Sequence, residues 1–589
     1  MIFAPVVVSN IGQGNPAPTT PKMNDKIKIV EPRNEVEIHL PDGRVLSGPR
    51  GAQVGEFLAV IEHESQLVAA IVNHDLRELT YPIEIESNVQ PLLMESTDGA
   101  RIYRRSLTFL LEMAFVDLFP SVTLYVDHSV ASGGYYCQVA GREVLSEAEV
   151  TALKIKMQEL IDADLPFEKS EIPLQQAVEY FRTRGDGDKV SLLKYRKKDF
   201  LTIYRLGERM DYLHGYMVPS TKYLSWFDLM TVPGGFILHF PRRHAPKELL
   251  PLPQYPKLLS SFLQYGQWLN KLGIANVGAL NDAIEVGRSD QIILVSEAFH
   301  EQHLADIARQ IGERVERSRI ILIAGPSSSG KTTTSRRLAI QLLALGISPF
   351  PLELDNYFLP RDQTPLGEDG KPDFETIEAL NLTLLAEHLQ KLLRGEKVQL
   401  PRYNFRVGRS EAGEEIQLAQ NQPLILEGIH GLNPQLIPEA LSGEAFRIYV
   451  SALTQLNLDR HNRVSTTDTR LIRRIVRDAR DRGYSATQTI TGWESVRRGE
   501  KRHIFPFQEN ADVMFNSALA YELAVLKPLA EPLLRQVQHG TPEYIEAKRL
   551  LAFLEWFLPL DLELVPETSI VREFLGGSVL KDFTIWKDK

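Results

Sequence analysis

The sequence predicts a multi-domain protein in which a β-grasp module and an α+β domain precede a C-terminal α/β P-loop domain. That last domain should hold a parallel sheet with flanking helices. Three observations support this fold class. The 589 residues exceed the roughly 100–200 residues of one domain. Short strands and turns dominate the first part, whereas strands and helices alternate from about residue 319 onward. A glycine-rich loop follows the first strand of that last part.

The composition is that of an ordinary globular protein. Apolar residues make up 43% and charged residues 24% of the chain. The net charge of −10 argues against a broad nucleic-acid-binding surface. Cys137 is the single cysteine, which excludes an internal disulfide and a thiolate metal cluster. The longest apolar runs, such as residues 320–324, are far shorter than the ~20 residues of a membrane span. We therefore expect a cytoplasmic protein that does not enter a membrane.

The first 95 residues divide into a tail and a β-rich module. Residues 1–26 are rich in Pro, Gly and Asn and have no basic stretch before their apolar segment, which predicts a disordered tail and not a signal peptide. Residues 27–95 contain an alternating strand at 36–40, a Pro-Asp-Gly turn and a short helix at 54–61. Further strands are expected at 67–72 and 79–85. This order predicts a β-grasp fold.

The middle of the chain reads as an α+β domain followed by helices. In residues 96–243, helices are expected at 106–118 and 147–163, and strands at 122–127, 134–139 and 235–240. The acidic run at 184–188 lacks the full calcium-loop pattern and predicts a plain turn. Residues 244–318 form a helical linker region. There His300-Glu301-Gln302-His303 is one residue short of the zinc-protease motif, and we expect a polar helix face.

The strongest motif is a complete Walker A loop at the start of the 319–589 domain. An apolar strand precedes it and a helix follows it, as a phosphate-binding loop requires. Glycines let backbone N–H groups approach phosphate oxygens, Lys331 supplies a positive charge, and the Thr332 hydroxyl can bind Mg²⁺. The predicted nucleotide-binding residues are Gly325, Pro326, Ser327, Ser328, Ser329, Gly330, Lys331, Thr332 and Thr333.

Two carboxylates follow other strands of the same predicted sheet. Asp355 comes after the second strand and Glu427 after a later one. Ligands of open parallel sheets bind at the carboxyl ends of the strands, so both should face the phosphates. Asp355 could accept a proton from an attacking hydroxyl, and Glu427 could lie beside Mg²⁺. A GTPase would need a guanine-reading Asn-Lys-x-Asp segment, and the sequence has none.

Arginines are concentrated between residues 460 and 502. On a helix beginning near Thr469, four of them share one side, and apolar residues take much of the other. A basic face against the site would stabilise charge during phosphoryl transfer. A solvated basic face and an RNA-binding patch are the alternatives. The four arginines are Arg470, Arg473, Arg474 and Arg477.

Residues 319–535 resemble the uridine kinase/phosphoribulokinase family. The segments that carry the resemblance are GPSSSGKTT (325–333), LDNYF (354–358), PDFETIEALN (372–381), PRYNF (401–405), LEGIH (426–430) and DTRLIRRIVRDARDRG (468–483). The resemblance implies ATP and Mg²⁺ as cofactors, Asp355 as catalytic base and Glu427 near the metal. It also implies that Arg470, Arg473 and Arg474 are lid arginines that close over ATP.

The same resemblance implies an acceptor site and two departures within it. Glu375 stands where the family often has an Asp that holds the ribose, and Tyr403 and Phe405 resemble aromatic residues around the base. Tyr357 and Phe358 complete the predicted substrate site, but Phe358 stands where uridine kinases have a tyrosine. Gly408 stands where they have a histidine that reads the base, so the base preference stays open.

Residues 36–243 resemble the front end of threonyl-tRNA synthetase, in which a TGS β-grasp domain precedes an editing domain. The segment HLPDGR (39–44) and the order of elements carry this resemblance. The editing domain's tetrad of metal-site-like residues is replaced here. We infer a module without editing chemistry that is kept for binding, regulation or assembly. The residues at the four positions are Arg105, Phe109, Leu213 and Met217.

Together these features predict an ATP- and Mg²⁺-dependent kinase that phosphorylates the 5′-hydroxyl of a nucleoside, of the uridine or cytidine type. A sugar-phosphate kinase is the first alternative. An RNA- or ribosome-associated regulator is the second, with tRNA as a less favoured partner of the N-terminal half. ATP versus GTP as donor and a homo-oligomeric state stay open.

Overall fold

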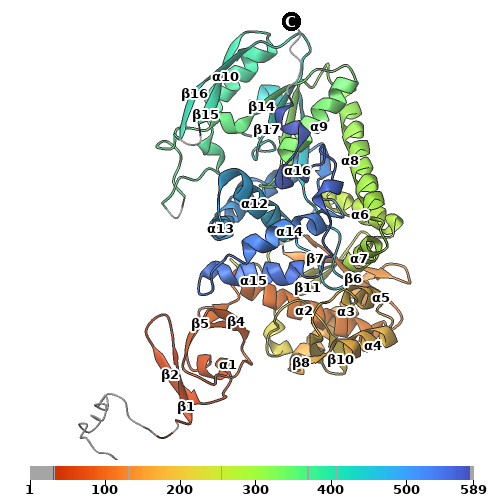
Figure 1. The fold of residues 1–589 in the computed structure, drawn as a ribbon, viewed down its shortest axis with the longest axis vertical. Helices are drawn as coiled ribbons and strands as arrows, with labels where there is room; N and C mark the ends of the chain where they lie inside the picture. The colour runs from red at the N-terminus through yellow and green to blue at the C-terminus, as the bar shows by residue number, and fades with distance from the viewer. Residues whose placement is uncertain are drawn as a thin grey trace, which may run out of the picture.

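The computed structural model describes residues 31–583 except 32, 131–132, 254, 368–369 and 405–406. The predicted tail at 1–26 lies outside these residues. The chain forms an elongated molecule with the N-terminal module near one end and the α/β domain at the other (Figure 1). No helix among the described residues is long and apolar enough to cross a membrane.

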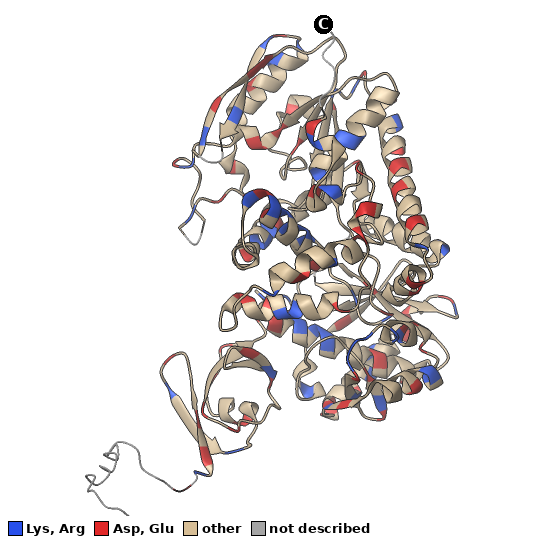
Figure 2. Ribbon diagram, in the orientation of Figure 1, with Lys and Arg blue, Asp and Glu red and all other residues tan. Residues whose placement is uncertain are grey.

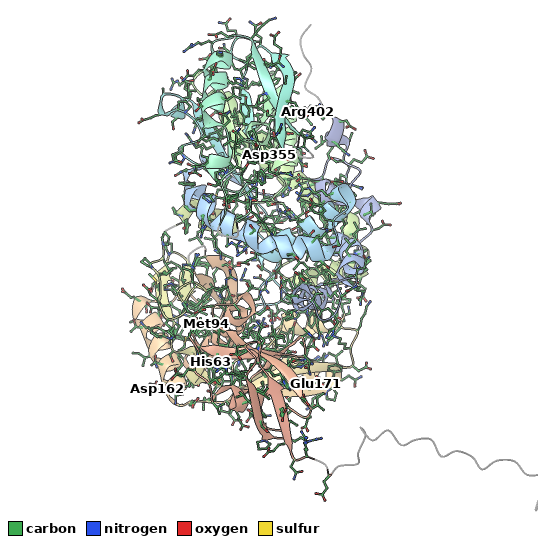
Figure 3. All side chains as sticks on the ribbon, turned by 90° about the vertical axis from the view of Figure 1, so that its left-hand side faces the viewer. His63, Met94, Asp162, Glu171, Asp355 and Arg402 are labelled. Atoms are coloured by element: carbon green, nitrogen blue, oxygen red, sulfur yellow. The ribbon has the colours of Figure 1, made fainter. Side chains whose placement is uncertain are left out.

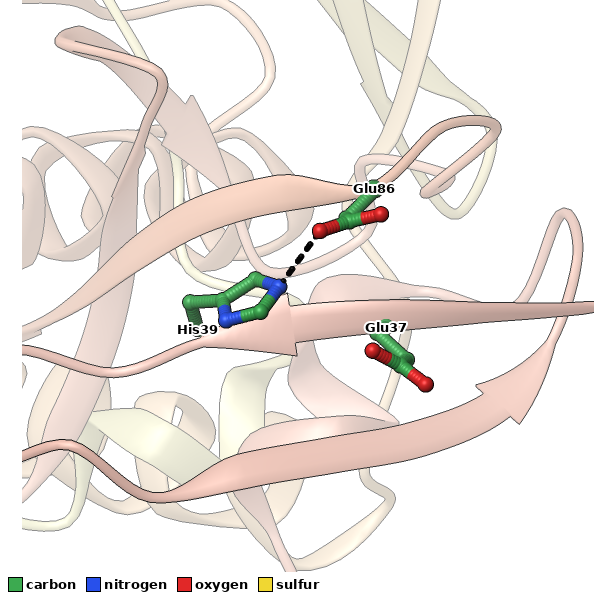
Figure 4. A group of neighbouring side chains, drawn as sticks. All are labelled: Glu37, His39 and Glu86. Carbon is green, nitrogen blue, oxygen red and sulfur yellow. Dashed lines mark hydrogen bonds and ion pairs between the residues drawn. The ribbon is translucent and has the colours of Figure 1, made fainter. Parts of the chain in front are cut away.

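The N-terminal module has the predicted β-grasp architecture. Its five-stranded sheet has the order β2-β1-β5-β3-β4, with β1 and β5 parallel. An exposed ion pair joins those two strands near their ends, where His39 Nε2 lies 2.8 Å from Glu86 Oε1 and Glu37 is close by (Figure 4). The elements are β1 (Glu35–His39), β2 (Val45–Pro49), α1 (Val54–Leu58), β3 (Leu67–Val72), β4 (Asp75–Glu78) and β5 (Ser87–Leu93).

The strand expected at 79–85 is wrong. The chain instead turns tightly after β3, because Asn73 and His74 both adopt positive φ angles of 48° and 70°. This conformation suits a two-residue hairpin, so β4 pairs with β3 directly. Pro82 lacks an N–H group and falls within the expected strand, which disfavours it there.

The second part is the predicted α+β domain. A long buried helix, α2, and α3 pack with a sheet of order β11-β12-β7-β6. A three-stranded sheet, β10-β9-β8, was not predicted, because β8 is polar and largely exposed. The elements are α2 (Thr97–Leu118), β6 (Thr123–Val130), β7 (Gly134–Ala140), α3 (Glu147–Asp162), β8 (Glu168–Pro173), α4 (Leu174–Arg184), α5 (Gly187–Leu193), β9 (Phe200–Leu206), β10 (Arg209–Asp211), η1 (Thr221–Leu224), β11 (Asp228–Val232) and β12 (Gly235–His239).

The acidic run at 184–188 is a turn, as expected. Gly185, at φ 81°, ends α4, and α5 begins two residues later. Its acidic side chains pair with arginines: Asp186 with Arg184, and Asp188 with Arg460.

Three helices connect this domain to the α/β domain: α6 (Pro256–Leu272), α7 (Val277–Glu285) and α8 (Ser289–Gly312). Apolar residues of α8, such as Leu304 and Ile311, join the core of the α/β sheet. The polar face predicted around His300 is wrong for that residue, which is buried with its Nε2 3.1 Å from the Ala518 carbonyl oxygen. Glu301 does pair with a charged group, accepting a 3.0 Å bond from Arg337 Nε.

The α/β domain contains the predicted parallel sheet, in the order β14-β17-β13-β18-β19. Its central strand β13 (Ile320–Ala324) is buried throughout and leads into α9 (Lys331–Ala344). The other strands of the sheet are β14 (Phe350–Glu353), β17 (Leu424–Glu427), β18 (Ala445–Ser451) and β19 (Val513–Asn516). The fold class predicted from the sequence is therefore confirmed.

Helices and one hairpin surround this sheet (Figure 1). The larger elements are α10 (Leu382–Leu393), β15 (Val398–Asn404), β16 (Arg409–Ile416), α12 (Thr466–Arg482), α13 (Ala486–His503), α14 (Glu522–Leu534) and α15 (Pro542–Leu554). The short elements are η2 (Leu354–Tyr357), η3 (Ile377–Ala379), α11 (Glu439–Ser442), η4 (Phe505–Asn510), η5 (Leu562–Leu564), α16 (Arg572–Leu575) and η6 (Val579–Asp582).

Buried polar contacts join the synthetase-like half to the α/β half. Arg101 of α2 donates to Glu546 of α15 at 2.7 Å. His461 of the α/β half lies 3.2 Å from Glu112 of α2 and 3.6 Å from Asp211 of β10. Burial lowers the pKa of His461, but the two carboxylates outweigh this effect and raise it to about 9. The imidazole is therefore a cation at neutral pH and holds the halves together.

Candidate active site

The phosphate loop occupies the turn between β13 and α9. Ser328 and Gly330 have φ angles of 58° and 85°, and such a turn can direct consecutive N–H groups toward an anion. Gly325 packs so closely that a Cβ atom would lie 1.9 Å from the Val450 carbonyl oxygen. Ser517 Oγ donates to the Ser329 carbonyl oxygen at 2.5 Å and supports the loop from behind.

Lys331 and Thr332 begin α9 inside this turn. Lys331 Nζ lies 3.3 Å from the Pro326 carbonyl oxygen, a neutral partner that leaves its charge available. The Thr332 hydroxyl donates to Glu427 Oε2 at 3.1 Å, so the predicted metal pair is in contact. Burial raises the pKa of Glu427 to about 7; Lys331 opposes this shift, and neighbouring carboxylates, Asp355 first, add to it. Hard oxygen donors with excess negative charge suit Mg²⁺, so these residues fit the metal that the resemblance implies.

Asp355 follows β14, two strands from β13 in the sheet, and lies in the upper part of the molecule, far from Met94 of the N-terminal module (Figure 3). Asp355 is exposed to solvent, yet protein atoms surround its carboxyl group densely and partly bury it. That burial raises the pKa of Asp355, while the Lys331 ammonium opposes the increase. Asp355, Lys331 and Glu427 thus meet at one edge of the sheet, as expected.

The three predicted lid arginines do not form one open basic face. Arg470 and Arg473 are at most 1% exposed and are bound in ion pairs with Glu500 and Glu522, so both lie in the core and not on an open surface; a role over ATP stays a prediction. Their guanidinium groups also bind the carbonyl oxygens of Ser327 and Ser328, the first at 2.8 Å and the second at 3.4 Å. The physical reason is that buried carboxylates supply the countercharge that lets arginine enter a core.

Arg474 remains beside the loop with a partly exposed side chain. Its Nη1 donates to Ser327 Oγ at 2.8 Å, and its Nε lies 3.2 Å from Asp478. Arg474 is therefore less buried than Arg470 and Arg473 and contacts the loop through the Ser327 side chain. Arg477 also pairs with Asp478, at 2.9 Å.

The predicted acceptor residues divide into two groups. Phe358 and Tyr403 come together, with ring centroids 5.8 Å apart. Tyr357 packs in the core, where it is 1% exposed and its hydroxyl lies 3.1 Å from His388 Nδ1. It also lines the pocket beside Thr332 and Glu427, and its contact with substrate stays a prediction. Phe405 lies outside the described residues. Gly408 packs against Arg361, where a Cβ would lie 3.0 Å from that side chain.

Glu375 lies near the phosphate loop. Burial raises the pKa of its carboxyl to about 7, and the nearby Glu500 carboxylate adds to the increase. Arg474 and Lys331 oppose it, which places Glu375 within reach of both cations. Its Oε2 atom is buried without a hydrogen-bond partner among the described residues.

Two carboxylates at the loop were not predicted. Glu500 of α13 accepts a bond from the Ser327 backbone N–H at 3.1 Å. Glu573 of α16 accepts from Thr333 twice, at 3.2 Å from its N–H and at 2.8 Å from its hydroxyl. Neither glutamate belongs to a motif, and both are more than 150 residues from the loop in sequence; a lone glutamate carries no local signal of such a contact.

The synthetase-like half keeps side chains of a different kind at its four tetrad positions. Phe109, Leu213 and Met217 are buried in its hydrophobic core. Arg105 donates to the Tyr216 carbonyl oxygen at 2.7 Å. These groups hold the core together and offer no set of hard-metal or zinc ligands.

The phosphate loop, the paired Thr332 and Glu427, and Asp355 just after the end of β14 form a site of the kind found in P-loop phosphotransferases. Residues 320–523 match the protein-family model of the Phosphoribulokinase / Uridine kinase family. The C-terminal region is accordingly similar to the kinases of that family. Nothing in the match selects one acceptor.

Known proteins resemble the chain over separate parts. The threonine–tRNA ligase of Lawsonia intracellularis is 30% identical over 176 residues, which are 30% of this chain and 27% of that protein. The threonine–tRNA ligase of Chloroherpeton thalassium is 30% identical over 206 residues, 34% of this chain and 31% of that protein. The N-terminal region carries this similarity, and the chain spans less than a third of the length of these two relatives.

Two solved structures align with part of the chain. A possible uridine kinase from Bacillus stearothermophilus has a TM-score of 0.24 and 15% identity, covering 35% of this chain and 99% of that one. The phosphoribulokinase from Rhodobacter spheroides has a TM-score of 0.24 and 18% identity, covering 34% of this chain and 70% of that one.

Proposed function

We propose that the protein transfers the γ-phosphoryl group of ATP to the 5′-hydroxyl of a nucleoside, of the uridine or cytidine type, and releases a nucleoside monophosphate. The observation that carries this proposal is the meeting of Lys331, Asp355 and the Thr332–Glu427 pair at one edge of the parallel sheet. A phosphate cradle, a metal-binding pair and a proton acceptor are the parts that phosphoryl transfer to an alcohol requires.

Each of these residues has a distinct task in the proposed reaction. Asp355 accepts the proton of the attacking hydroxyl, and its raised pKa makes it a better acceptor than an ordinary aspartate. Lys331 and Arg474 stabilise negative charge on the phosphate oxygens. Mg²⁺ held by Thr332 and Glu427 would supply further positive charge to the phosphates. The buried Arg470 and Arg473 position the loop through its carbonyl oxygens.

The acceptor site favours a flat base over a bare sugar phosphate. The rings of Phe358 and Tyr403 pack edge to face, and Phe374 lies 5.5 Å from Phe358 in the same group. Aromatic side chains bind nucleobases through their ring faces and edges. Glu375 is proposed to hold ribose hydroxyls. A sugar-phosphate kinase is the second candidate, because the family match includes phosphoribulokinases.

The test is a substrate panel with the purified full-length protein. Mg-ATP is supplied with each common nucleoside and with phosphopentoses, and monophosphate products are separated by chromatography. Turnover of uridine or cytidine supports the proposal. Turnover of phosphopentoses alone would replace it with the second candidate. Turnover of none would move the assignment to the RNA-associated regulator.

A further inference from the structure

A cavity lies where the synthetase-like half meets the α/β half. It has a volume of about 690 Å³, and residues of α2, α12, α13 and α15 contribute to its wall. This volume is within the range of small-molecule sites. None of the residues of the phosphate loop, 325–333, lines it. Lys and Arg gather on α12 and around α2 and α15 (Figure 2).

The wall of this cavity carries positive charges without carboxylate partners. Five cationic side chains line it with no carboxylate oxygen of a described residue within 4.0 Å. Their contacts are neutral or aromatic: Arg105 donates to the Tyr216 carbonyl oxygen, and Arg463 to that of Val464. Arg104 lies over the Phe240 ring at 4.9 Å. The five cations are Arg104, Arg105, Arg463, Arg497 and Lys501.

Two other arginines of the same wall do form ion pairs with carboxylates. Arg243 pairs with Glu494, and Arg549 pairs with Asp468 at 2.8 Å and Glu546 at 2.7 Å. The carboxylates of the wall are thus used by these arginines. The five unpaired cations leave the cavity with excess positive charge.

The pKa values of two of these cations are lowered, as expected for buried positive charges without carboxylate partners. Burial lowers the pKa of Arg104 to about 10, and the cations Arg101, Arg242 and Arg463 lower it further. Burial also lowers the pKa of Lys501 to about 8; Arg497 and Arg243 add to the decrease, and Glu494 only partly opposes it. Buried charges of one sign are unfavourable without a counterion. A bound anion would remove this penalty.

We propose that this cavity binds a compact polyphosphate anion, either a nucleoside polyphosphate or an inorganic polyphosphate, at a site separate from the phosphate loop. The unpaired guanidinium groups match phosphate oxygens, with which arginine forms paired hydrogen bonds. Trp493 also lines the cavity, with its Nε1 buried and unpartnered among the described residues. The synthetase-like half would thus bind a ligand of its own. Arg105, at one of the four positions of the editing-domain tetrad, lines this site.

The cavity also touches the proposed kinase site through one side chain. Arg470 lines the cavity wall and binds both Glu500 and the Ser327 carbonyl oxygen at the phosphate loop. A ligand in the cavity and the phosphate loop are therefore connected through the single side chain of Arg470.

The test measures tripolyphosphate binding by isothermal titration calorimetry. The full-length Lys331→Ala variant is used, so that the phosphate loop contributes little. Binding should persist in this background and weaken at least about tenfold when Arg104→Gln and Arg463→Gln are added, since two charge-assisted hydrogen bonds are lost. The exposed Arg205→Gln is the matched control and should leave the affinity unchanged. If the double substitution prevents folding, Lys501→Gln provides the same comparison.

The ligand series separates the sources. ATP or UTP binding more tightly than tripolyphosphate indicates a nucleotide, and equal or weaker binding indicates an inorganic polyphosphate. Equal affinity of the Lys331→Ala protein with and without the cavity substitutions would overturn the proposal. So would binding of a tRNA 3′ end at this site without binding of either small anion.

Discussion

Glu573 should compete with nucleotide for the phosphate loop. Its carboxylate accepts hydrogen bonds from the Thr333 N–H at 3.2 Å and from the Thr333 hydroxyl at 2.8 Å. Thr333 lies in the first turn of α9. Helix N-termini bind phosphate through such N–H groups. A nucleotide phosphate must therefore displace this carboxylate or bind beside it. Glu573→Gln keeps the size of the side chain and removes its charge.

The magnitude follows from Coulomb's law. Two unit charges about 5 Å apart interact by about 3 kcal/mol at an effective dielectric constant of about 20. Glu573 is half-buried and its side chain can turn away, so about 1–2 kcal/mol is a reasonable gain, or about 5–30-fold tighter binding. The assay is the Kd of a non-hydrolysable ATP analogue, measured by calorimetry at fixed Mg²⁺. Glu567→Gln, an exposed residue of the same segment, is the control.

An unchanged Kd in Glu573→Gln would refute this reasoning. Weaker binding would refute it more strongly, because it would show that the carboxylate assists the bound nucleotide or its metal. An unchanged Kd would mean that the contact between α16 and the loop is a structural cap with no bearing on nucleotide access.

Three further predictions concern the metal, the interface and the cavity. Thr332→Val should raise the Mg²⁺ concentration for half-maximal activity at least about tenfold, because a ligand hydroxyl is lost; a magnesium titration of the rate checks this. His461→Gln should destabilise the protein by up to about 3 kcal/mol below pH 6.5, because the raised pKa of His461 stabilises the folded state there. This difference in stability should fade as the pH rises through about 9. Urea unfolding at several pH values measures it, and a pH-independent difference would contradict the ion pair. Lys501→Met should stabilise the ligand-free protein by up to about 3 kcal/mol below pH 8, because the folded state holds this proton less tightly. The gain should disappear above about pH 10.5, and thermal unfolding at pH 7 and 10.5 tests this.

Local signals predicted the parts of the site that are continuous in sequence. The Walker A segment predicts the turn that it forms, and the buried apolar run at residues 320–324 predicts the strand before it. The positions of Asp355 and Glu427 followed because the ends of parallel strands meet at one edge. Hence the fold class and most of the phosphate site could be inferred without coordinates.

Ion pairs between residues far apart in the sequence could not be predicted from local patterns. Arg470 and Arg473 were expected on one open basic face toward the site, because nothing nearby in sequence reveals that Glu500 and Glu522 lie opposite them in the core. The strand expected at 79–85 failed for a local reason: the positive φ angles of Asn73 and His74 moved the hairpin to an earlier position. Both errors arise where tertiary contacts or turn geometry override side-chain patterns.

The central claim is that Asp355 activates an acceptor hydroxyl beside a nucleotide held by the phosphate loop. The most direct measurement is transfer of labelled γ-phosphate from ATP to uridine by the wild-type protein and by Asp355→Asn, with the Kd of ATP determined for both. We predict that Asp355→Asn lowers kcat by about 10²–10⁴-fold, the usual contribution of a general base, while the ATP Kd changes little. Equal transfer rates in the two proteins, or no transfer by the wild type to any nucleoside, would contradict the account.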